Sequence, residues 1–149
     1  MKFFLCVPFT SRVNDAGAVQ SEYRTHLEEL TNYIKSKGHQ YYLALEYAGW
    51  IMGGHTDPED ELRHDFEQID DSEIVIALLE ERVSAGVQLE NGYAYAKNKK
   101  VYIYQIGKPA WSNIAFATIA GHDIKTVADD SEFINQAKLL VEHLSLRST

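Results

Sequence analysis

The chain has 149 residues, of which 45% are hydrophobic and 24% charged, the composition of a soluble globular protein with one sizeable core. Its formal net charge of -8 argues against a nucleic-acid polymer or an anionic membrane as partner, because both bind basic surfaces. The single cysteine, Cys6, permits no intrachain disulfide, so a reducing cytoplasm is the expected compartment. We expect a single domain over residues 1–149.

The first half of the chain predicts two strands and a helix. Residues 2–8, KFFLCVP, predict a buried strand, because their apolar run is too short for a secretory leader. Residues 18–38 carry apolar side chains at helical spacing, and a glycine ends that helix. Residues 39–45, HQYYLAL, predict a second strand, and a loop with three glycines follows over residues 46–56.

The middle of the chain repeats this alternation. Residues 57–70 predict a helix with Asp57 as its cap and Pro58 at its first position. Residues 73–79, EIVIALL, predict the clearest buried strand of the sequence. A helix is expected over residues 84–99.

The last third predicts a strand, a loop, a short strand and a closing helix. Residues 100–106, KVYIYQI, form the fourth strand, and residues 107–121 are expected to be a loop with at most one helical turn. Residues 122–127 fit a short edge strand. Residues 130–144 predict a helix with Asp130 or Ser131 as cap.

Strands that alternate with helices indicate βαβ units with right-handed crossovers. The expected fold is α/β: a three-layer, doubly wound, flavodoxin-like or Rossmann-like parallel sheet of four or five strands. Ligands of such sheets bind at the carboxyl ends of the strands. That rule selects four segments for the site: PFTSRVND, EYAGW, EERVSAG and KPAWSN.

One carboxylate, Glu90, falls on the apolar side of the helix that follows the strongest strand. Helical spacing places Val87, Glu90, Asn91 and Ala94 on one stripe. By spacing alone, Glu90 could also lie at the stripe's edge and reach solvent. Its position in the first two turns favours a functional role, and the positive end of the helix dipole would keep it ionised as a nucleophile.

A carboxylate nucleophile works with a second acidic group, since one group attacks carbon and the other manages the proton or holds the substrate. Asp65, on the helix before the strongest strand, is the candidate. No metal or cofactor is expected: His55 and His64 lack H-x-x-x-H spacing and a cysteine partner. Cys6 is interpreted as a buried structural thiol, and the tyrosines of the strands as packing residues.

The segment from Asp65 to Lys99 contains the pattern S-x-G-x-x-x-E-x-G-x-A, which begins at Ser84 and contains Glu90. This segment resembles the nucleoside 2-deoxyribosyltransferase superfamily. The N-terminal FLCVPFTSR and the EYAGW loop resemble its branch that cleaves nucleoside 5′-monophosphates, which includes deoxynucleotide N-glycosidases and CMP N-ribosidases. The resemblance covers about the first 120 residues.

The resemblance implies that Glu90 attacks C1′ to form a covalent glycosyl-enzyme and that Asp65 assists proton transfer or sugar positioning. The implied substrate-binding residues are Phe9, Thr10, Ser11, Arg12, Glu46, Trp50, Ser84, Gly86, Ser112 and Asn113. Among them, Thr10 and Arg12 match phosphate-binding positions. Ser84 matches a position that is Asp in the free-nucleoside transferases.

The resemblance also implies that Ser112 or Asn113 reaches a neighbouring subunit across a dimer, and that Glu46 and Trp50 lie near the base or sugar. We therefore expect a homodimer or tetramer that acts on a small nucleotide or nucleoside. The CMP N-ribosidases have an Arg directly after the Phe that matches Phe9, where this chain has Thr10. The choice of phosphate-binding arginine, and of ribose or deoxyribose, stays open.

Three functions follow from these observations. The first is hydrolysis of the N-glycosidic bond in a nucleoside 5′-monophosphate, which Ser84, Thr10 and Arg12 favour because a hydroxyl leaves room for phosphate. The second is transfer of 2-deoxyribose between bases. The third is a nucleotide sensor without turnover, which the retention of both Glu90 and Asp65 argues against.

Overall fold

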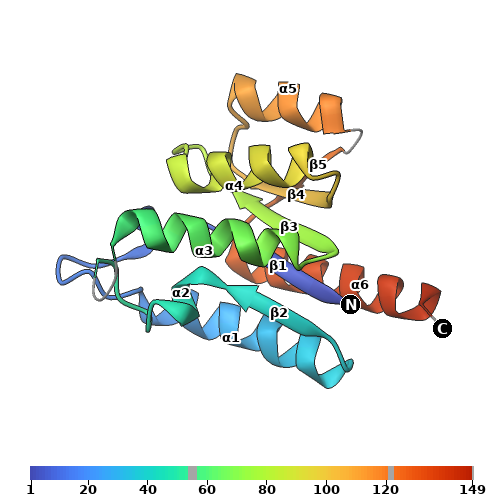
Figure 1. The fold of residues 1–149 in the computed structure, drawn as a ribbon, viewed down its shortest axis with the longest axis horizontal. Coiled ribbons are helices and arrows are strands. Elements are labelled where there is room, and N and C mark those ends of the chain that lie inside the picture. The colour runs from blue at the N-terminus through green and yellow to red at the C-terminus, as the bar shows by residue number, and fades with distance from the viewer. Residues whose placement is uncertain (54–56, 121–122, 149) are drawn as a thin grey trace.

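The computed structural model describes residues 1–53, 57–120 and 123–148, and its centre is a five-stranded sheet (Figure 1). All neighbouring strands pair in parallel, in the order β2-β1-β3-β4-β5. The strands are β1 (Lys2–Cys6), β2 (Gln40–Leu43), β3 (Ile74–Leu79), β4 (Lys100–Ile106) and β5 (Ile124–Val127). The predicted doubly wound, flavodoxin-like α/β fold is confirmed, with β2 and β5 as edge strands.

Helices cover both faces of the sheet, so the fold has three layers (Figure 1). The long helices are α1 (Ser21–Ser36), α3 (Pro58–Asp70), α4 (Ala85–Ala96), α5 (Trp111–Ala120) and α6 (Asp130–Arg147). The short ones are the 3-10 turn η1 (Thr10–Arg12) and α2 (Ala44–Tyr47). No helix within the described ranges is long and apolar enough to cross a membrane.

The two faces of the sheet enclose two separate apolar cores, because successive side chains of a strand point to opposite sides. Phe3 and Leu5 of β1 pack against α1 and α6. Phe4 and Cys6 lie in the core beneath α3 and α4. The active-site candidates Glu90 and Asp65 are both on helices of this second layer.

Several predicted boundaries are confirmed and others are wrong. Helix α3 begins at Pro58 with Asp57 as its cap, and Asp57 accepts a hydrogen bond from the Glu59 backbone. The cap of α6 is Asp129, not Asp130 or Ser131. The expectation of a loop over residues 107–121 is wrong, because this segment contains the ten-residue helix α5, which packs against α4. The sequence of α5 has no polar face, so its spacing does not indicate an amphipathic helix.

Candidate active site

Helix α4 presents the predicted stripe to the sheet. Val87, Glu90, Asn91 and Ala94 are all buried, which confirms the spacing argument. Glu90 is only 9% exposed, so it does not reach solvent from the edge of the helix. A carboxyl group buried to this degree needs partners, because desolvation of its charged form is costly.

The closest polar neighbour of Glu90 is the thiol of Cys6, at the end of β1. Cys6 Sγ lies 3.1 Å from Glu90 Oε2, in donor position, and 3.6 Å from the Val87 carbonyl. Because β1 is an inner strand of the sheet and α4 packs on its face, residues 84 positions apart meet here. The interpretation of Cys6 as a buried thiol is confirmed, and its contact with Glu90 is an addition.

Asp65 of α3 faces Glu90 from the neighbouring helix. Its Oδ1 accepts a hydrogen bond of 2.7 Å from the hydroxyl of Tyr42, on edge strand β2. Helices α3 and α4 therefore supply the two carboxyl groups, and strands β1 and β2 supply one hydrogen-bond donor to each, Cys6 to Glu90 and Tyr42 to Asp65.

The pair binds a proton near neutral pH. Burial raises the pKa of Glu90 to about 8; the Cys6 thiol opposes this rise, and the charge and hydrogen bond of Asp65 add to it. Burial also raises the pKa of Asp65, against the hydrogen bond from Tyr42. The expectation that the helix dipole keeps Glu90 ionised is wrong: the dipole acts over the first turn, and Glu90 lies in the second, where burial dominates.

A small aromatic cavity opens beside Asp65. Its volume is about 60 Å³, and its lining residues are Phe9, Tyr42, Ala44, Tyr47, Ala48, Glu61 and Asp65. The ring of His64 stacks on Tyr47 with centroids 4.3 Å apart. The aromatic rings of Tyr42, Tyr47 and the predicted site residue Phe9 form walls of this cavity.

A second cavity lies at the start of α4. Its volume is about 250 Å³, and it is lined by Thr10, Ser11, Arg82, Val83, Ser84, Ala85 and Gly86. Four predicted substrate-binding residues meet here: Thr10, Ser11, Ser84 and Gly86. The N-terminus of a helix, with its free amides, favours an anion at this place.

Arg12 does not line either of these two cavities. Its Nε donates to Glu80, and its two terminal nitrogens lie 2.5 and 2.8 Å from the carboxylate of Asp130. Burial works against this cation, but the hydrogen bonds to Asp130 and the nearby charges raise the pKa of Arg12. The guanidinium thus joins the β1 and β3 loops to α6, and Arg82 is the arginine that faces the cavity.

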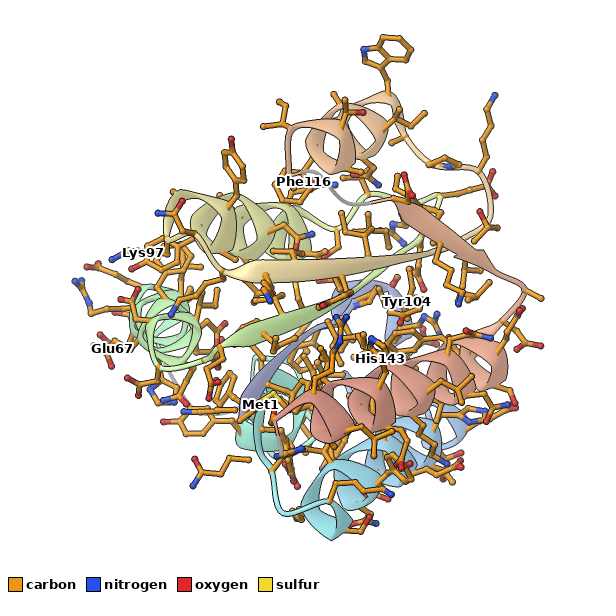
Figure 2. The ribbon with its side chains drawn as sticks, turned by 90° about the vertical axis from the view of Figure 1, so that its right-hand side faces the viewer. Met1, Glu67, Lys97, Tyr104, Phe116 and His143 are labelled. Carbon is orange, nitrogen blue, oxygen red and sulfur yellow. The ribbon has the colours of Figure 1, made fainter. Side chains whose placement is uncertain are left out.

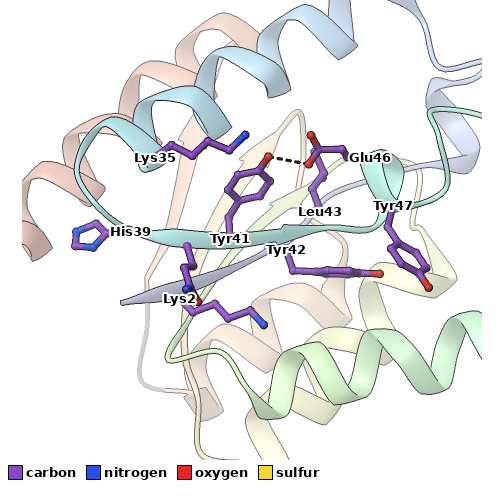
Figure 3. Close-up of a pocket in the computed structure, with 9 residues that line it drawn as sticks. Lys2, Lys35, His39, Tyr41, Tyr42, Leu43, Glu46 and Tyr47 are labelled. Atoms are coloured by element: carbon purple, nitrogen blue, oxygen red, sulfur yellow. Dashed lines mark hydrogen bonds between the residues drawn. The ribbon is translucent and has the colours of Figure 1, made fainter.

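Glu46 and Trp50 lie away from the carboxyl pair. The Tyr41 hydroxyl donates to Glu46 over 2.8 Å; both point to the α1 side of β2, whereas Tyr42 and Tyr47 point to the other side (Figure 3). Trp50 is buried in the α1-side core, with Arg24 over its ring at 4.9 Å. Their contact with a base or sugar stays a prediction.

Ser112 and Asn113 lie in the first turn of α5, apart from both cavities. Ser112 is exposed, and Asn113 is buried and accepts a hydrogen bond from Gln88 of α4. Phe116 lies on the side of α5 that faces α4 (Figure 2), where its ring meets Tyr95. Their role across a dimer stays a prediction.

Three residues of the site are not apparent from the sequence: Cys6 as a partner of Glu90, Tyr42 as a partner of Asp65, and Arg82. Tyr42 does pack in the sheet, with its ring stacked on Phe4, but its hydroxyl reaches Asp65. Alternation along β2 could have shown that Tyr42 and Tyr41 face opposite layers. Within the described ranges, no group of three or more His, Cys, Asp or Glu could hold a metal ion, and His55 lies outside those ranges.

Comparison with solved structures shows the same fold in a CMP N-glycosidase, in BlsM and in a 2-deoxyribosyltransferase. The CMP N-glycosidase BcmB of Clostridium botulinum matches with a TM-score of 0.68 and 18% identity over 94% of this chain and 99% of that one. The solution structure of BlsM matches with a TM-score of 0.70 and 18% identity over 99% and 93%. A 2-deoxyribosyltransferase of Bacillus psychrosaccharolyticus matches with a TM-score of 0.61 and 17% identity, over 91% of each chain.

No curated protein shows significant sequence similarity to the chain. At the level of families the match is extensive, because residues 16–138 fit the family described as nucleoside 2-deoxyribosyltransferase. That range contains Asp65, Ser84 and Glu90. The chain therefore belongs to the nucleoside 2-deoxyribosyltransferase family of enzymes, which act on the N-glycosidic bond.

Proposed function

We propose that this enzyme hydrolyses the N-glycosidic bond of a nucleoside 5′-monophosphate through a covalent glycosyl-Glu90 intermediate and releases the free base. The observation that carries the proposal is the carboxyl pair of buried Glu90 and partly buried Asp65, beside an aromatic cavity. Two carboxyl groups that share a proton provide both a nucleophile and an acid.

Each proton transfer of the proposed reaction can be assigned to this pair. Glu90 attacks C1′ as a carboxylate, the C1′–N bond breaks, and the departing base takes the bonding electrons and a proton from Asp65. Water then attacks C1′ of the ester, its proton passes to Asp65, and Glu90 is released as a carboxylate. The resting pair carries one proton, and its transfer from Glu90 to Asp65 prepares the first step.

The cavity at the start of α4 supports a phosphate on the substrate. Arg82 supplies a positive charge, Ser84 and Thr10 supply hydroxyls, and the first amides of α4 point into the same region. Ser84 and Glu90 are separated by roughly 9 Å along the helix axis. A substrate can therefore place its phosphate at the helix start and its sugar near the second turn.

We also propose that the enzyme works as a homodimer in the cytoplasm, with α5 at the subunit interface. Helix α5 exposes Trp111, Ile114 and Ile119 to 85%, 43% and 65%, and its other side already packs on α4. An apolar surface of this kind is typical of interfaces, and a second copy would close an open site against water. Light scattering should give at least twice the chain mass of 16.9 kDa.

Mixed subunits test whether the site is shared. Glu90→Gln and Ser112→Trp, each inactive alone, should regain part of the activity on mixing, because a hybrid dimer holds one site without either change. An active monomer would contradict the shared site and leave the role of Glu90 intact.

The central experiment is an acid quench during turnover with a panel of ribo- and deoxyribonucleoside 5′-monophosphates. Chromatography should show free base, and intact-protein mass spectrometry should show one sugar phosphate, which peptide mapping assigns to Glu90. Glu90→Gln is the matched control and should show neither. Incubation with a second free base separates hydrolysis from transfer, since only a transferase forms a new nucleotide.

A purely binding protein would behave differently in the same experiment. A nucleotide would raise its melting temperature without any base release, and no adduct would form on Glu90. That outcome would exclude the proposed hydrolysis.

A further inference from the structure

Cys6 occupies a place that the proposed reaction does not yet explain. It is the only cysteine of the chain, the last residue of β1, and 0% exposed. Its Sγ lies 3.1 Å from Glu90 Oε2 and 3.6 Å from the Val87 carbonyl. Both partners are acceptors when Glu90 is ionised, so the thiol acts as the donor.

The chemistry of the thiol excludes a role as nucleophile or base. Burial, the charge of Glu90 and the hydrogen bond to it all raise the pKa of Cys6. With its pKa raised, Cys6 stays an S–H group at neutral pH. Only a thiolate attacks carbon or accepts a proton, so this thiol does neither. What remains is its effect on Glu90.

The carboxyl pair has one such donor on each member. Cys6 donates to Glu90 from β1, and Tyr42 donates to Asp65 from β2 over 2.7 Å. The other ionisable groups that act on the pair, His64 and Glu61, both lie on α3 and act on Asp65. A donor stabilises the ionised form of the carboxyl group that it contacts. The two donors therefore pull the shared proton in opposite directions.

We propose that Cys6 is a positioning residue, whose thiol holds Glu90 Oε2 and biases the shared proton of the pair towards Asp65. This inference rests on the proposed role of Glu90 as nucleophile. The reaction needs Glu90 as a carboxylate and Asp65 as an acid, and that is the arrangement favoured by a donor on Glu90. A thiol is a weak donor, so it orients the carboxylate without greatly reducing its nucleophilicity.

Burial raises the pKa of Glu90, and the hydrogen bond from the Cys6 thiol lowers it. Loss of the thiol should therefore raise this pKa. Cys6→Ala removes the donor, so the acidic limb of the pH profile of kcat should move to higher pH by about 0.5–1 unit. Cys6→Ser keeps a donor and should restore the limb to within about 0.3 unit of the wild type. Tyr42→Phe removes the donor on Asp65, so a larger share of the singly protonated pair should carry its proton on Asp65, and the plateau of kcat should not fall as it does when the donor on Glu90 is lost.

Val75→Ala is the matched control for lost packing. Val75 lies on β3 in the same core as Cys6 and has no hydrogen bond to the pair. It should lower the melting temperature as Cys6→Ala does and leave the acidic limb unchanged. A limb that moves equally in Cys6→Ala and Val75→Ala, or in neither, would overturn the inference.

A second measurement uses the folded wild-type protein and needs no turnover. Because Cys6 is the only thiol, the infrared S–H stretching band reports on it alone. The band should shift as Glu90 ionises, with a midpoint at the pKa of Glu90, and should not shift in Glu90→Gln. A pH-independent band in the wild type overturns the role of Cys6. A shifting band in an enzyme that releases no base would contradict the proposed hydrolysis and leave the contact itself confirmed.

Discussion

Two acidic clusters lie near the carboxyl ends of the strands, and only one of them contains a cation. Glu80 and Asp130, with side chains 14% and 21% exposed, flank the guanidinium of Arg12. Glu90 and Asp65 have each other instead, and no lysine or arginine within the described ranges is ion-paired with either.

The difference separates a structural cluster from a functional one. A buried cation between two carboxylates fixes three segments in place, and its loss leaves unpaired charges. A buried carboxyl pair without a cation retains a proton and has an unstable charged form, which is typical of catalytic sites. The fold is therefore expected to depend on the first cluster and turnover on the second.

The largest effect is expected from Glu90→Gln. The amide is a poor nucleophile, so kcat should fall by at least about 10³-fold, whereas Asp65→Asn should cost about 10²-fold because it removes acid assistance alone. Steady-state base release measures both. Nucleotide binding, followed by thermal shift, should survive in Glu90→Gln. Substantial base release by this variant would refute the mechanism.

Arg12→Met should have the largest effect on stability. It keeps the side-chain stem and leaves the largely buried carboxylates of Glu80 and Asp130 without their cation, at a cost of about 3 kcal/mol in the free energy of unfolding. Denaturant unfolding at neutral pH measures it. The control is Arg63→Met, which breaks an exposed pair with Glu59 on α3 and should cost about 0.5 kcal/mol. Equal losses would mean that the Arg12 cluster is not structural.

Substitution in the carboxyl pair should raise the free energy of unfolding at high pH, whereas Arg12→Met lowers it. The pKa of Glu90 in the folded protein, about 8, lies above its ordinary value of 4.5. The stability that Glu90 contributes is therefore present in full below pH 4.5 and is lost as the pH rises through 8. Glu90→Gln removes this loss. The variant should be more stable than the wild type by about 2–4 kcal/mol near pH 9, with no gain at low pH.

Unfolding at both pH values in the same denaturant checks the sign. Glu142→Gln is a suitable control, since the hydrogen bonds from Lys37 and Tyr33 lower the pKa of that half-buried carboxylate. A Glu90→Gln variant that is less stable than the wild type at high pH would show that the buried charge is compensated.

The sequence predicted most of the fold because its signals are local. Apolar runs mark the strands, and the spacing of Leu27, Leu30 and Ile34 marks the buried face of α1. Helix α5 was missed for a physical reason: WSNIAFATIA carries apolar side chains on every side, so no amphipathic period distinguishes it from a loop.

The site was predictable only where it depends on one helix. The spacing within α4 placed Glu90 on the buried stripe without any knowledge of the sheet. The partners of Arg12 lie 68 and 118 residues away, and Cys6 lies 84 residues from Glu90. Such pairings depend on strand order and on how each helix crosses the sheet, which no local pattern contains.

The smallest effect, and the one that sharpens the comparison most, concerns the two arginines. If Arg82 binds the phosphate, Arg82→Ala should raise KM for nucleoside monophosphates about tenfold, the value of one charge-assisted hydrogen bond. Any weak activity on free nucleosides should not change, because they lack the phosphate. Arg12→Met, assayed well below its melting temperature, should leave the preference for monophosphates over free nucleosides near that of the wild type. The guanidinium of Arg12 is already bound by Glu80 and Asp130, so it is not expected to bind phosphate. The reverse result, with a raised KM only in Arg12→Met, would mean that phosphate displaces a carboxylate from Arg12, and the structural cluster would then be part of the substrate site.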